Sequence, residues 1–414
     1  MDATTIRVRE PRELLALLPY QLGFRPEHSA VAVALRPPRG RVGLVARVDL
    51  VDLADHEGGP QLARRLVTHL VGDGADRAVL VLYTGADPRG GQGPCQGQRP
   101  VPGPTPGPVS VATSGPGSGR RPVEHPPAAW VDVPPAVRHF RSAAGAFLGE
   151  VPVWVVCAQG YLSLDCADDA CCPPGGRPLV ELESTEVGAH MVLAGAMVAD
   201  SRELLVPEPS VGAQARRNAV RAAARWAAQR SAAEQAGPAA LAAWRLSGLR
   251  AWRSEVATAR TGDAGVRAAA LARVGVALAD VAVRDAVLLS LVASAGDLPE
   301  RSLAPRAPDD AALSGRIADL LGSILSPRDG VPPDEALHAS SAAVLDRVAA
   351  HQRPCERAPT LTLLALLAWW HGDGARAGVL LDRARGAEPG YRLGRLLREA
   401  LAAGLAPGWV QAQP

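Results

Sequence analysis

Three cysteines within seven residues offer the most specific chemistry in this chain. Cys166, Cys171 and Cys172 lie in the stretch DCADDACC, which has a C-x4-CC spacing. Thiolates are preferred ligands of zinc, although zinc sites usually take them from two separated pairs. Cys157 lies nine residues earlier and could supply a fourth thiolate, but a buried strand position is the simpler interpretation for it. The cluster therefore indicates a candidate zinc site.

Two other interpretations of this cluster stay open. In the simplest one the three residues are plain loop cysteines, and no bound cofactor is expected. In the other, two of them form a disulfide or redox pair, which between Cys166 and Cys171 requires the loop to curl back. Asp165, Asp168 and Asp169 make the surroundings acidic. We expect these carboxylates to raise the thiol pKa values and to oppose a nucleophilic role.

An arginine-rich region at 212–260 is the second candidate site. Arg217, Arg221 and Arg225 follow i, i+4, i+8 spacing and therefore share one face of a predicted helix. Arginines interleaved with tryptophans can bind phosphates and stack bases, so the pattern is compatible with a polyanion or a nucleic acid. In the opposing interpretation, acidic residues of 280–346 neutralise the arginines and the tryptophans anchor a core. The net charge of +2 gives no global support for nucleic acid, which is therefore a possible partner but not the favoured one.

Polar residues after the second predicted strand form a weaker candidate. Asp49, Asp52, Asp55, His56 and Glu57 carry the oxygen and nitrogen atoms that could hold a divalent cation. Their spacing matches no metal loop, and a solvated connection with acidic residues near a helix start explains them more simply. An enzyme with a polar or metal-dependent site at these strand ends stays open as an alternative function.

The chain contains no lysine, and this absence excludes several lysine-dependent activities. A P-loop phosphate site, a pyridoxal-phosphate enzyme and a protein kinase each need a lysine in their usual form. No Ser/His/Asp set, G-x-S-x-G elbow or H-E-x-x-H motif is legible either. The residues therefore favour a non-catalytic role.

The elements that must position these residues begin with an α/β domain at 1–202. Apolar runs rich in valine and alanine predict strands at 29–35, 41–50, 78–83, 151–157 and 161–164. Apolar periodicity predicts helices at 61–71, 134–148 and 185–198. This order favours a mixed sheet covered by helices. Residues 85–128 interrupt it with 10 glycines and 11 prolines, a composition typical of a disordered insertion.

An all-α domain is predicted at 212–414, after a linker at 203–211 that contains two prolines. Helices are expected at 213–235, 238–260, 264–280, 284–295, 309–325, 333–350, 359–371, 375–387 and 391–403. Gly372, Ala377, Ala384 and Pro389 fall at offsets resembling a tetratricopeptide repeat, which predicts a C-terminal hairpin of that shape. No second copy is legible at the repeat distance, so an array of repeats is not predicted.

Four segments in combination resemble an actinobacterial family, the domain of unknown function family 4192. They are ELLALLPYQLGFRPEHSAVAVAL, VGLVARVDL, SLDCADDACCPPGGRPL and LLALLAWWHGDGARAGVLLDRARGAEPGYRLGRLL, which are spread between residues 13 and 397. The insertion at 85–128 falls outside the resemblance. The resemblance implies an actinobacterial, cytoplasmic protein without an assigned activity, and it supplies no site residues.

Together these observations predict a cytoplasmic, non-catalytic interaction or regulatory protein with a protein partner. The polar opening of the chain does not resemble a signal peptide, and the apolar runs are too short to span a bilayer, so no membrane association is expected. Six cysteines in 414 residues do not resemble a disulfide scaffold, and reduced thiols are expected.

Overall fold

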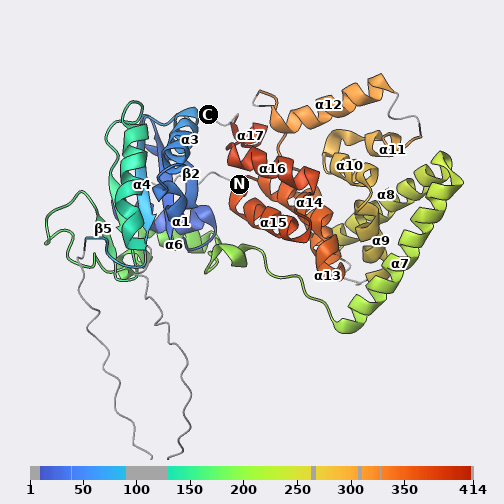
Figure 1. Ribbon diagram of the computed structural model, residues 1–414, viewed down its shortest axis with the longest axis horizontal. Helices are drawn as coiled ribbons and strands as arrows, with labels where there is room; N and C mark the ends of the chain where they lie inside the picture. Colours follow the sequence, from blue (N-terminus) through green and yellow to red (C-terminus); the bar gives the residue numbers. More distant parts are fainter. Residues whose placement is uncertain are drawn as a thin grey trace, which may run out of the picture. The chain divides into compact units, whose positions relative to one another are not determined.

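The chain divides into two compact units, residues 1–198 and residues 199–414 (Figure 1). The computed structural model describes residues 10–38, 40–89, 129–262, 267–305, 310–326 and 328–411. The expected disorder of 85–128 falls, from residue 90 onward, outside these described residues.

The first unit is built on a five-stranded mixed sheet, as the sequence predicts. The strands are β1 (Ser29–Arg36), β2 (Arg41–Asp49), β3 (Arg77–Tyr83), β4 (Val153–Val156) and β5 (Tyr161–Ser163). Their order is β2-β1-β3-β4-β5, and only the β3–β4 pair is parallel. The carboxyl ends of β3 and β4 therefore meet at one edge of the sheet, which is where ligand sites of α/β folds commonly form.

Among the residues that the structure describes in this unit, six helices accompany the sheet (Figure 1). They are α1 (Pro11–Leu22), α2 (Leu50–Ala54), α3 (Gly59–Gly72), α4 (Ala129–Ala144), α5 (Val180–Glu183) and α6 (Glu186–Leu193). Strand β1 shows why both sheet faces are covered: its alanines at 30, 32 and 34 join a core with α3 and α4, while Val31 and Val33 are buried on the other face. A strand buried on both faces has no polar alternation, and this accounts for the run SAVAVALR.

Short elements depart from the sequence-based prediction. The helix expected at 185–198 ends at Leu193, because Gly195 adopts a left-handed conformation with φ of 77°. The prediction also omitted α2 and α5, which have five and four residues and are too short to show a helical period.

The second unit is all-helical, as expected. Its helices are α7 (Ala213–Ala236), α8 (Pro238–Arg260), α9 (Ala268–Leu278), α10 (Val281–Ser290), α11 (Leu298–Arg301), α12 (Ala311–Leu325), α13 (Glu335–His351), α14 (Ala358–Trp370), α15 (Gly374–Ala387), α16 (Arg392–Ala402) and α17 (Gly408–Gln411), with short 3-10 turns at Arg202–Leu205, Ala293–Ala295 and Pro354–Glu356. Helix α10 starts three residues earlier than predicted, because the Asp280 carboxylate accepts bonds from the backbone N–H groups of Ala282 and Val283.

Helix α14 lies at the centre of this unit. Its sequence APTLTLLALLAWW is apolar on all sides, and 12 of its 13 residues are buried. Helices α13, α15 and α16 pack against it. Among the helices of the described residues, none is long and apolar enough to cross a membrane.

The segment expected as a linker at 203–211 belongs to the second unit. Val206 is only 5% exposed and joins the helical core. The guanidinium of Arg383 on α15 donates hydrogen bonds to the carbonyl groups of Glu203, Val206 and Pro207. These contacts make the segment part of the helical fold rather than a free connection.

Candidate metal centre

A tight turn after β5 brings the three cysteines of the cluster together. We call residues 165–177 the cysteine loop. The backbone N–H groups of Cys171 and Cys172 both donate to the Asp168 carbonyl oxygen, at 3.1 and 2.7 Å. The Asp168 carboxylate in turn accepts from the backbone of Ala170 at 2.9 Å. The loop curls back on itself in this way, so that residues 171 and 172 return to Cys166.

The sulfur atoms of Cys166, Cys171 and Cys172 lie within 4.8 Å of one another. Tetrahedral zinc with bonds of about 2.3 Å requires sulfur atoms roughly 3.8 Å apart, so small side-chain adjustments suffice to bind the ion. Cys172 is buried, Cys166 is half-buried and Cys171 is exposed. This gradient anchors one side of the cluster in the core and leaves the other side open to solvent.

The thiols of Cys166 and Cys171 have pKa values shifted in opposite directions. Hydrogen bonding with the backbone of Asp168 is the main cause that lowers the pKa of Cys166, and the neighbouring Cys172 and Cys171 thiols lower it further. The pKa of Cys171 is raised, chiefly because its thiol hydrogen-bonds to the Cys166 sulfur and lies beside the charge there. The charge of Asp168 does raise the pKa of Cys166, as expected of an acidic neighbour, but the backbone hydrogen bond and the neighbouring thiols outweigh it, so the net pKa is lowered. The thiolate of Cys166 therefore forms more readily than that of Cys171, as suits a first metal ligand.

Two residues after β3 hold the cysteine loop against the sheet. Arg89 donates to the carbonyl oxygens of Cys172 at 3.1 Å and Pro173 at 2.9 Å. The Asp87 carboxylate pairs with Arg89 and accepts from the Gly175 backbone at 2.9 Å. Burial opposes ionisation of Asp87, but the bonds from Arg89 and Gly175 outweigh it, so the pKa of Asp87 is lowered.

The sequence-based prediction does not include Asp87 and Arg89 in the site. Residues 85–89 begin a Gly/Pro-rich stretch, and their composition therefore assigns them to the insertion. The structure corrects that boundary: Asp87 is 7% exposed and bonded to the cysteine loop. A usable signal was present in the sequence, since an Asp and an Arg directly after a buried strand are well placed to bond with a neighbouring loop.

The end of the cysteine loop pairs with β5 through glycines. The Arg177 and Tyr161 backbones exchange hydrogen bonds of 2.9 and 2.8 Å. A Cβ atom at Gly176 would lie 2.8 Å from the Tyr161 nitrogen, and φ at this glycine is 85°. Only glycine fits here, so the PPGG sequence is what lets the loop close against the sheet.

Cys157 is not part of the sulfur cluster. It directly follows β4, is 4% exposed and joins the core shared with α3 and α4. Its sulfur lies 3.9 Å from the Gly175 carbonyl oxygen. It therefore contributes to packing beneath the loop, and the fourth coordination position is left to a group other than this thiol.

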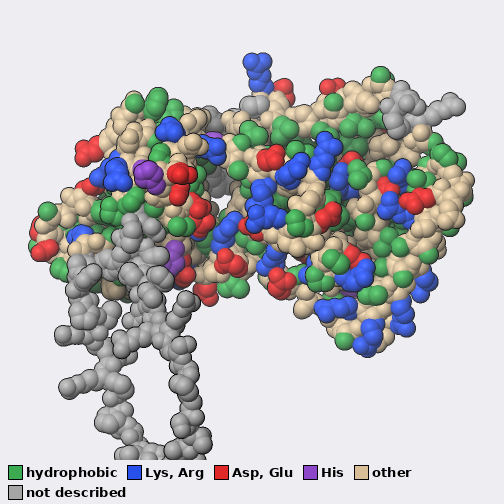
Figure 2. Space-filling view, viewed as in Figure 1, with side chains coloured by type: hydrophobic (Ala, Val, Ile, Leu, Met, Phe, Trp, Pro, Cys, Tyr) green, Lys and Arg blue, Asp and Glu red, His purple; other side chains and the backbone are tan. Residues whose placement is uncertain are grey.

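The structure exposes Arg217, Arg221 and Arg225 along α7. Arg217 donates to the Gln214 side chain at 2.6 Å and Arg221 to the Asn218 side chain at 2.7 Å, and both acceptors are neutral. Within the described residues, no ion pair involves these three arginines. Figure 2 shows basic side chains gathered along the outer edge of the region that α7 occupies.

Other arginines of the region are neutralised, as the opposing interpretation predicted. Arg245 pairs with Asp280 at 3.0 Å, and Arg253 pairs with Glu300 at 2.9 Å. Trp244 and Trp252 are buried in the helical core rather than free to stack on bases.

Two of the acidic residues at and after the end of β2 have partners within the protein. Asp55 accepts from the N–H groups of Glu57 and Gly58 at 3.1 and 2.6 Å, just before α3, and Asp49 pairs with Arg47 at 2.6 Å. Across the described ranges, the cysteine cluster is the one group of three or more His, Cys, Asp or Glu residues whose ligand atoms converge.

Fold and site together define a protein with an α/β unit that carries a three-thiol loop, followed by an all-helical unit. The chain belongs to the family described as Domain of unknown function (DUF4192), whose profile matches residues 11–305 and 328–408. No curated protein and no solved structure matches the chain. The cysteine loop, Asp87 and Arg89 all lie within the first matched range.

Proposed function

We propose that this protein is a non-catalytic interaction or regulatory protein whose α/β unit binds a zinc ion through Cys166, Cys171 and Cys172. The observation that carries the zinc site is the convergence of three sulfur atoms to within 4.8 Å in a loop closed by its own backbone bonds. Soft thiolate ligands select zinc over magnesium or calcium. A cytoplasmic setting fits the proposal, because its reducing conditions keep such thiols free.

The ion would act mainly as a cross-link and as a contact point. Bonded to Cys166 and to Cys171 and Cys172, it would join the two ends of the turn. Exposure of Cys171 leaves the fourth position facing solvent, where water or a ligand from a partner can bind. A metal centre of this kind links loop stability to partner binding without requiring a catalytic base.

Metal analysis of the purified full-length chain tests this site. Protein prepared without chelator should contain about one zinc per chain, because such sites bind tightly at neutral pH. The Cys171→Ser variant should lose that zinc, whereas Cys355→Ser, which changes an exposed cysteine of the helical unit, should retain it.

Metal-free protein whose thiol reactivity is equal at all three positions would contradict the zinc site. A loss of two free thiols on mild oxidation, with no metal bound, would instead identify a redox pair. The two results are distinguished by measuring zinc and free thiols on the same sample.

The helical unit supports the interaction part of the proposal. Helices α14 and α15 pack against each other, the small residues Ala377 and Ala384 of α15 are buried, and Gly372 between the two helices has φ of 85°. Helix α16 covers α15. We infer a hairpin of tetratricopeptide-like shape with a capping helix, an arrangement suited to holding a protein partner.

A second candidate function is polyanion binding by α7. It is favoured by the exposure of Arg217, Arg221 and Arg225 without an acidic partner in the described residues. The triple variant R217E/R221E/R225E should weaken binding to a duplex oligonucleotide. The plot of log affinity against log salt concentration should become less steep by about 2.7, since three phosphate contacts are lost. A matched reversal of three exposed arginines on α15 and α16, R385E/R392E/R395E, is the control. Equal losses in both variants would show that net charge alone is responsible.

A further inference from the structure

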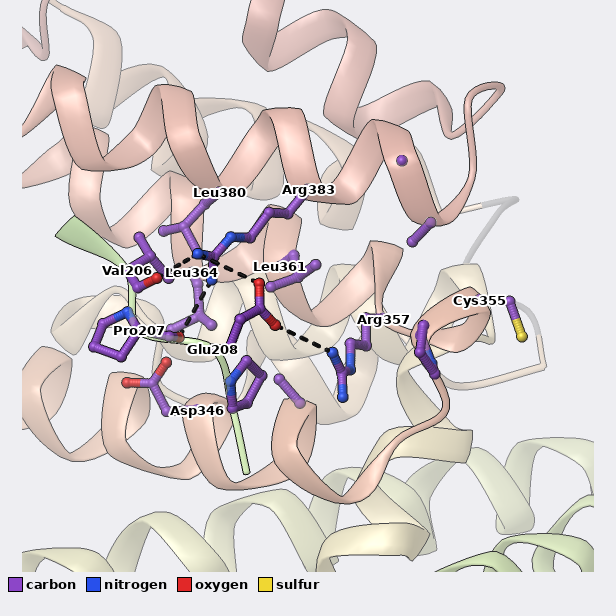
Figure 3. A pocket seen from close by; sticks show the side chains of 15 residues that line it. Val206, Pro207, Glu208, Asp346, Cys355, Arg357, Leu361, Leu364, Leu380 and Arg383 are labelled. Atoms are coloured by element: carbon purple, nitrogen blue, oxygen red, sulfur yellow. Dashed lines mark hydrogen bonds and ion pairs between the residues drawn. The ribbon is translucent and has the colours of Figure 1, made fainter. Parts of the chain in front are cut away.

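A pocket of about 500 Å³ lies within the helical unit, between α13, α14, α15 and the extended residues 206–209 (Figure 3). Its apolar wall includes Leu361, Leu364 and Leu380. We call residues 206–209, with the sequence Val-Pro-Glu-Pro, the strap, because they run along one side of this pocket.

The strap is held through its backbone. Arg383 donates to the Pro207 carbonyl at 3.2 Å and to the carbonyl of Val206, and it also reaches Glu203 at 3.3 Å. A guanidinium that donates hydrogen bonds to main-chain carbonyl groups can bind an extended chain of almost any sequence, because these contacts do not involve its side chains. Val206 is the one buried side chain of the strap and joins the helical core, whereas Pro207 and Glu208 are exposed.

A carboxylate of the strap sits between two arginines. Glu208 lies 3.4 Å from Arg383 and 3.9 Å from Arg357, and its side chain is 72% exposed (Figure 3). The Nε atom of Arg357 is buried without a hydrogen-bond partner. Burial is the main cause that lowers the pKa of Arg357, and the positive charges of Arg216 and Arg383 lower it further. Asp346 of α13 also lines the pocket and lies 4.0 Å from Arg376, so Glu208 is the carboxylate that pairs with Arg357 and Arg383, through long and exposed contacts.

We propose that the groove between α13, α14 and α15 binds an extended acidic peptide of a partner protein, and that the strap is a weak built-in ligand for the same groove. The partner supplies a carboxylate flanked by proline, with an aliphatic side chain before it. Its carboxylate pairs with Arg357 and Arg383, and its carbonyl groups accept from Arg383. A larger apolar side chain than Val206 fills the unoccupied volume against Leu361, Leu364 and Leu380.

This inference rests on the proposed interaction function and names the class of partner. When the strap occupies the groove, a peptide cannot bind there. The apparent affinity for a peptide is therefore the intrinsic affinity multiplied by the fraction of molecules whose groove is open. The strap competes at the high effective concentration of a tethered segment, so weakening it should increase peptide binding. Removing the groove arginine Arg383 should cancel that increase.

Fluorescence polarisation with a capped, labelled peptide LLVPEPSV, the sequence of residues 204–211, provides the test on the full-length chain. The variant V206S/E208A loosens the strap and should bind the peptide about tenfold more tightly than the unmodified chain. Adding R383A to that variant should return the affinity to the unmodified level or below. The peptide LLVPQPSV, which lacks the carboxylate, should bind about tenfold more weakly than LLVPEPSV.

The result that overturns the proposal is a folded V206S/E208A variant, with unchanged circular dichroism, that binds the peptide no better than the unmodified chain. If that variant does not fold, the conservative change Glu208→Gln takes its place and should still increase the affinity for the peptide severalfold. An unchanged affinity in that variant would also contradict the proposal. Zinc content is measured in each sample, so that failure of the groove is separated from failure of the metal centre. Equal binding of both peptides would identify an apolar groove without carboxylate recognition and would also contradict the proposal.

Discussion

His338 is a base that the helical unit keeps uncharged. Its side chain is 1% exposed, its ring lies edge-on to Trp370 with centroids 4.5 Å apart, and its Nε2 is 3.0 Å from the Leu291 carbonyl oxygen. Burial is the main cause that lowers the pKa of His338 to about 4, although the bond to Leu291 opposes the shift. The folded state therefore stays neutral at pH values where the unfolded chain already binds a proton.

The stability of the folded state should therefore decrease as the pH is lowered, because of His338. A folded-state pKa below the unfolded value means that the unfolded state binds more protons, so stability rises with pH and is lost as pH falls from about 6.5 towards 4. Between pH 7 and pH 5 we expect the unfolding free energy to drop by about 2 kcal/mol from His338. Urea unfolding at both pH values measures this change, which His338→Gln should remove.

His56→Gln, which changes an exposed histidine of the other unit, is the matched control. An identical pH dependence in His338→Gln and in the unmodified chain would show that the buried ring does not govern it.

The cysteine site illustrates what residue types alone can predict. Three closely spaced cysteines identified the location, because half of the six cysteines of the chain fall within seven residues there. The opposite pKa shifts of Cys166 and Cys171 were not predictable, since they follow from the turn at Asp168 and from which sulfur lies beside which. Electrostatic effects depend on distance and on hydrogen-bond direction, and sequence spacing fixes neither.

At the scale of elements, the segment after β3 makes a specific contribution. Asp87 and Arg89 hold the cysteine loop, whereas residues 90–128 carry the Gly/Pro-rich composition. Replacing 90–128 by a Gly/Ser linker of about ten residues should leave the melting temperature and the zinc content nearly unchanged. A fall of about 5 °C would show that the replaced segment packs.

The double variant D87A/R89A should behave differently. It removes the bonds to Cys172, Pro173 and Gly175, and we expect a loss of about 2 kcal/mol with weaker zinc retention. Thermal unfolding and metal analysis measure both effects. An exposed pair on α16 is the control, because R395A/E399A removes an ion pair of equal charge from the surface. Equal effects of the two double variants would contradict the anchoring role.

The strands and the long helices were predictable, whereas the shortest helices were not. The five strands follow from uninterrupted apolar runs, and the long helices follow from helical periodicity, which is strong over ten or more residues. Helices α2, α5, α11 and α17 have four or five residues each and no period to detect. Helix ends differ from the prediction where a capping side chain sets them, as Asp280 does at the start of α10.

At the scale of the whole molecule, each unit has its own core. The alanine and valine pattern of the strands joins α3 and α4 in the first, and the leucines and tryptophans of α8, α13 and α14 form the second. Few aromatic residues are available, so small and aliphatic side chains must provide most of the packing in both.

Composition and patterns between near neighbours are enough to predict the mixed sheet, the helical second half and the location of the thiol cluster, and the lack of lysine excludes lysine-dependent chemistry in its usual form. That Asp87 and Arg89 hold the cysteine loop, and that the strap at 206–209 lies along the helices, becomes visible in the folded chain alone. Arg383 and Val206 are separated by 177 positions, and a contact over that distance is set by how helices pack, which no local pattern records.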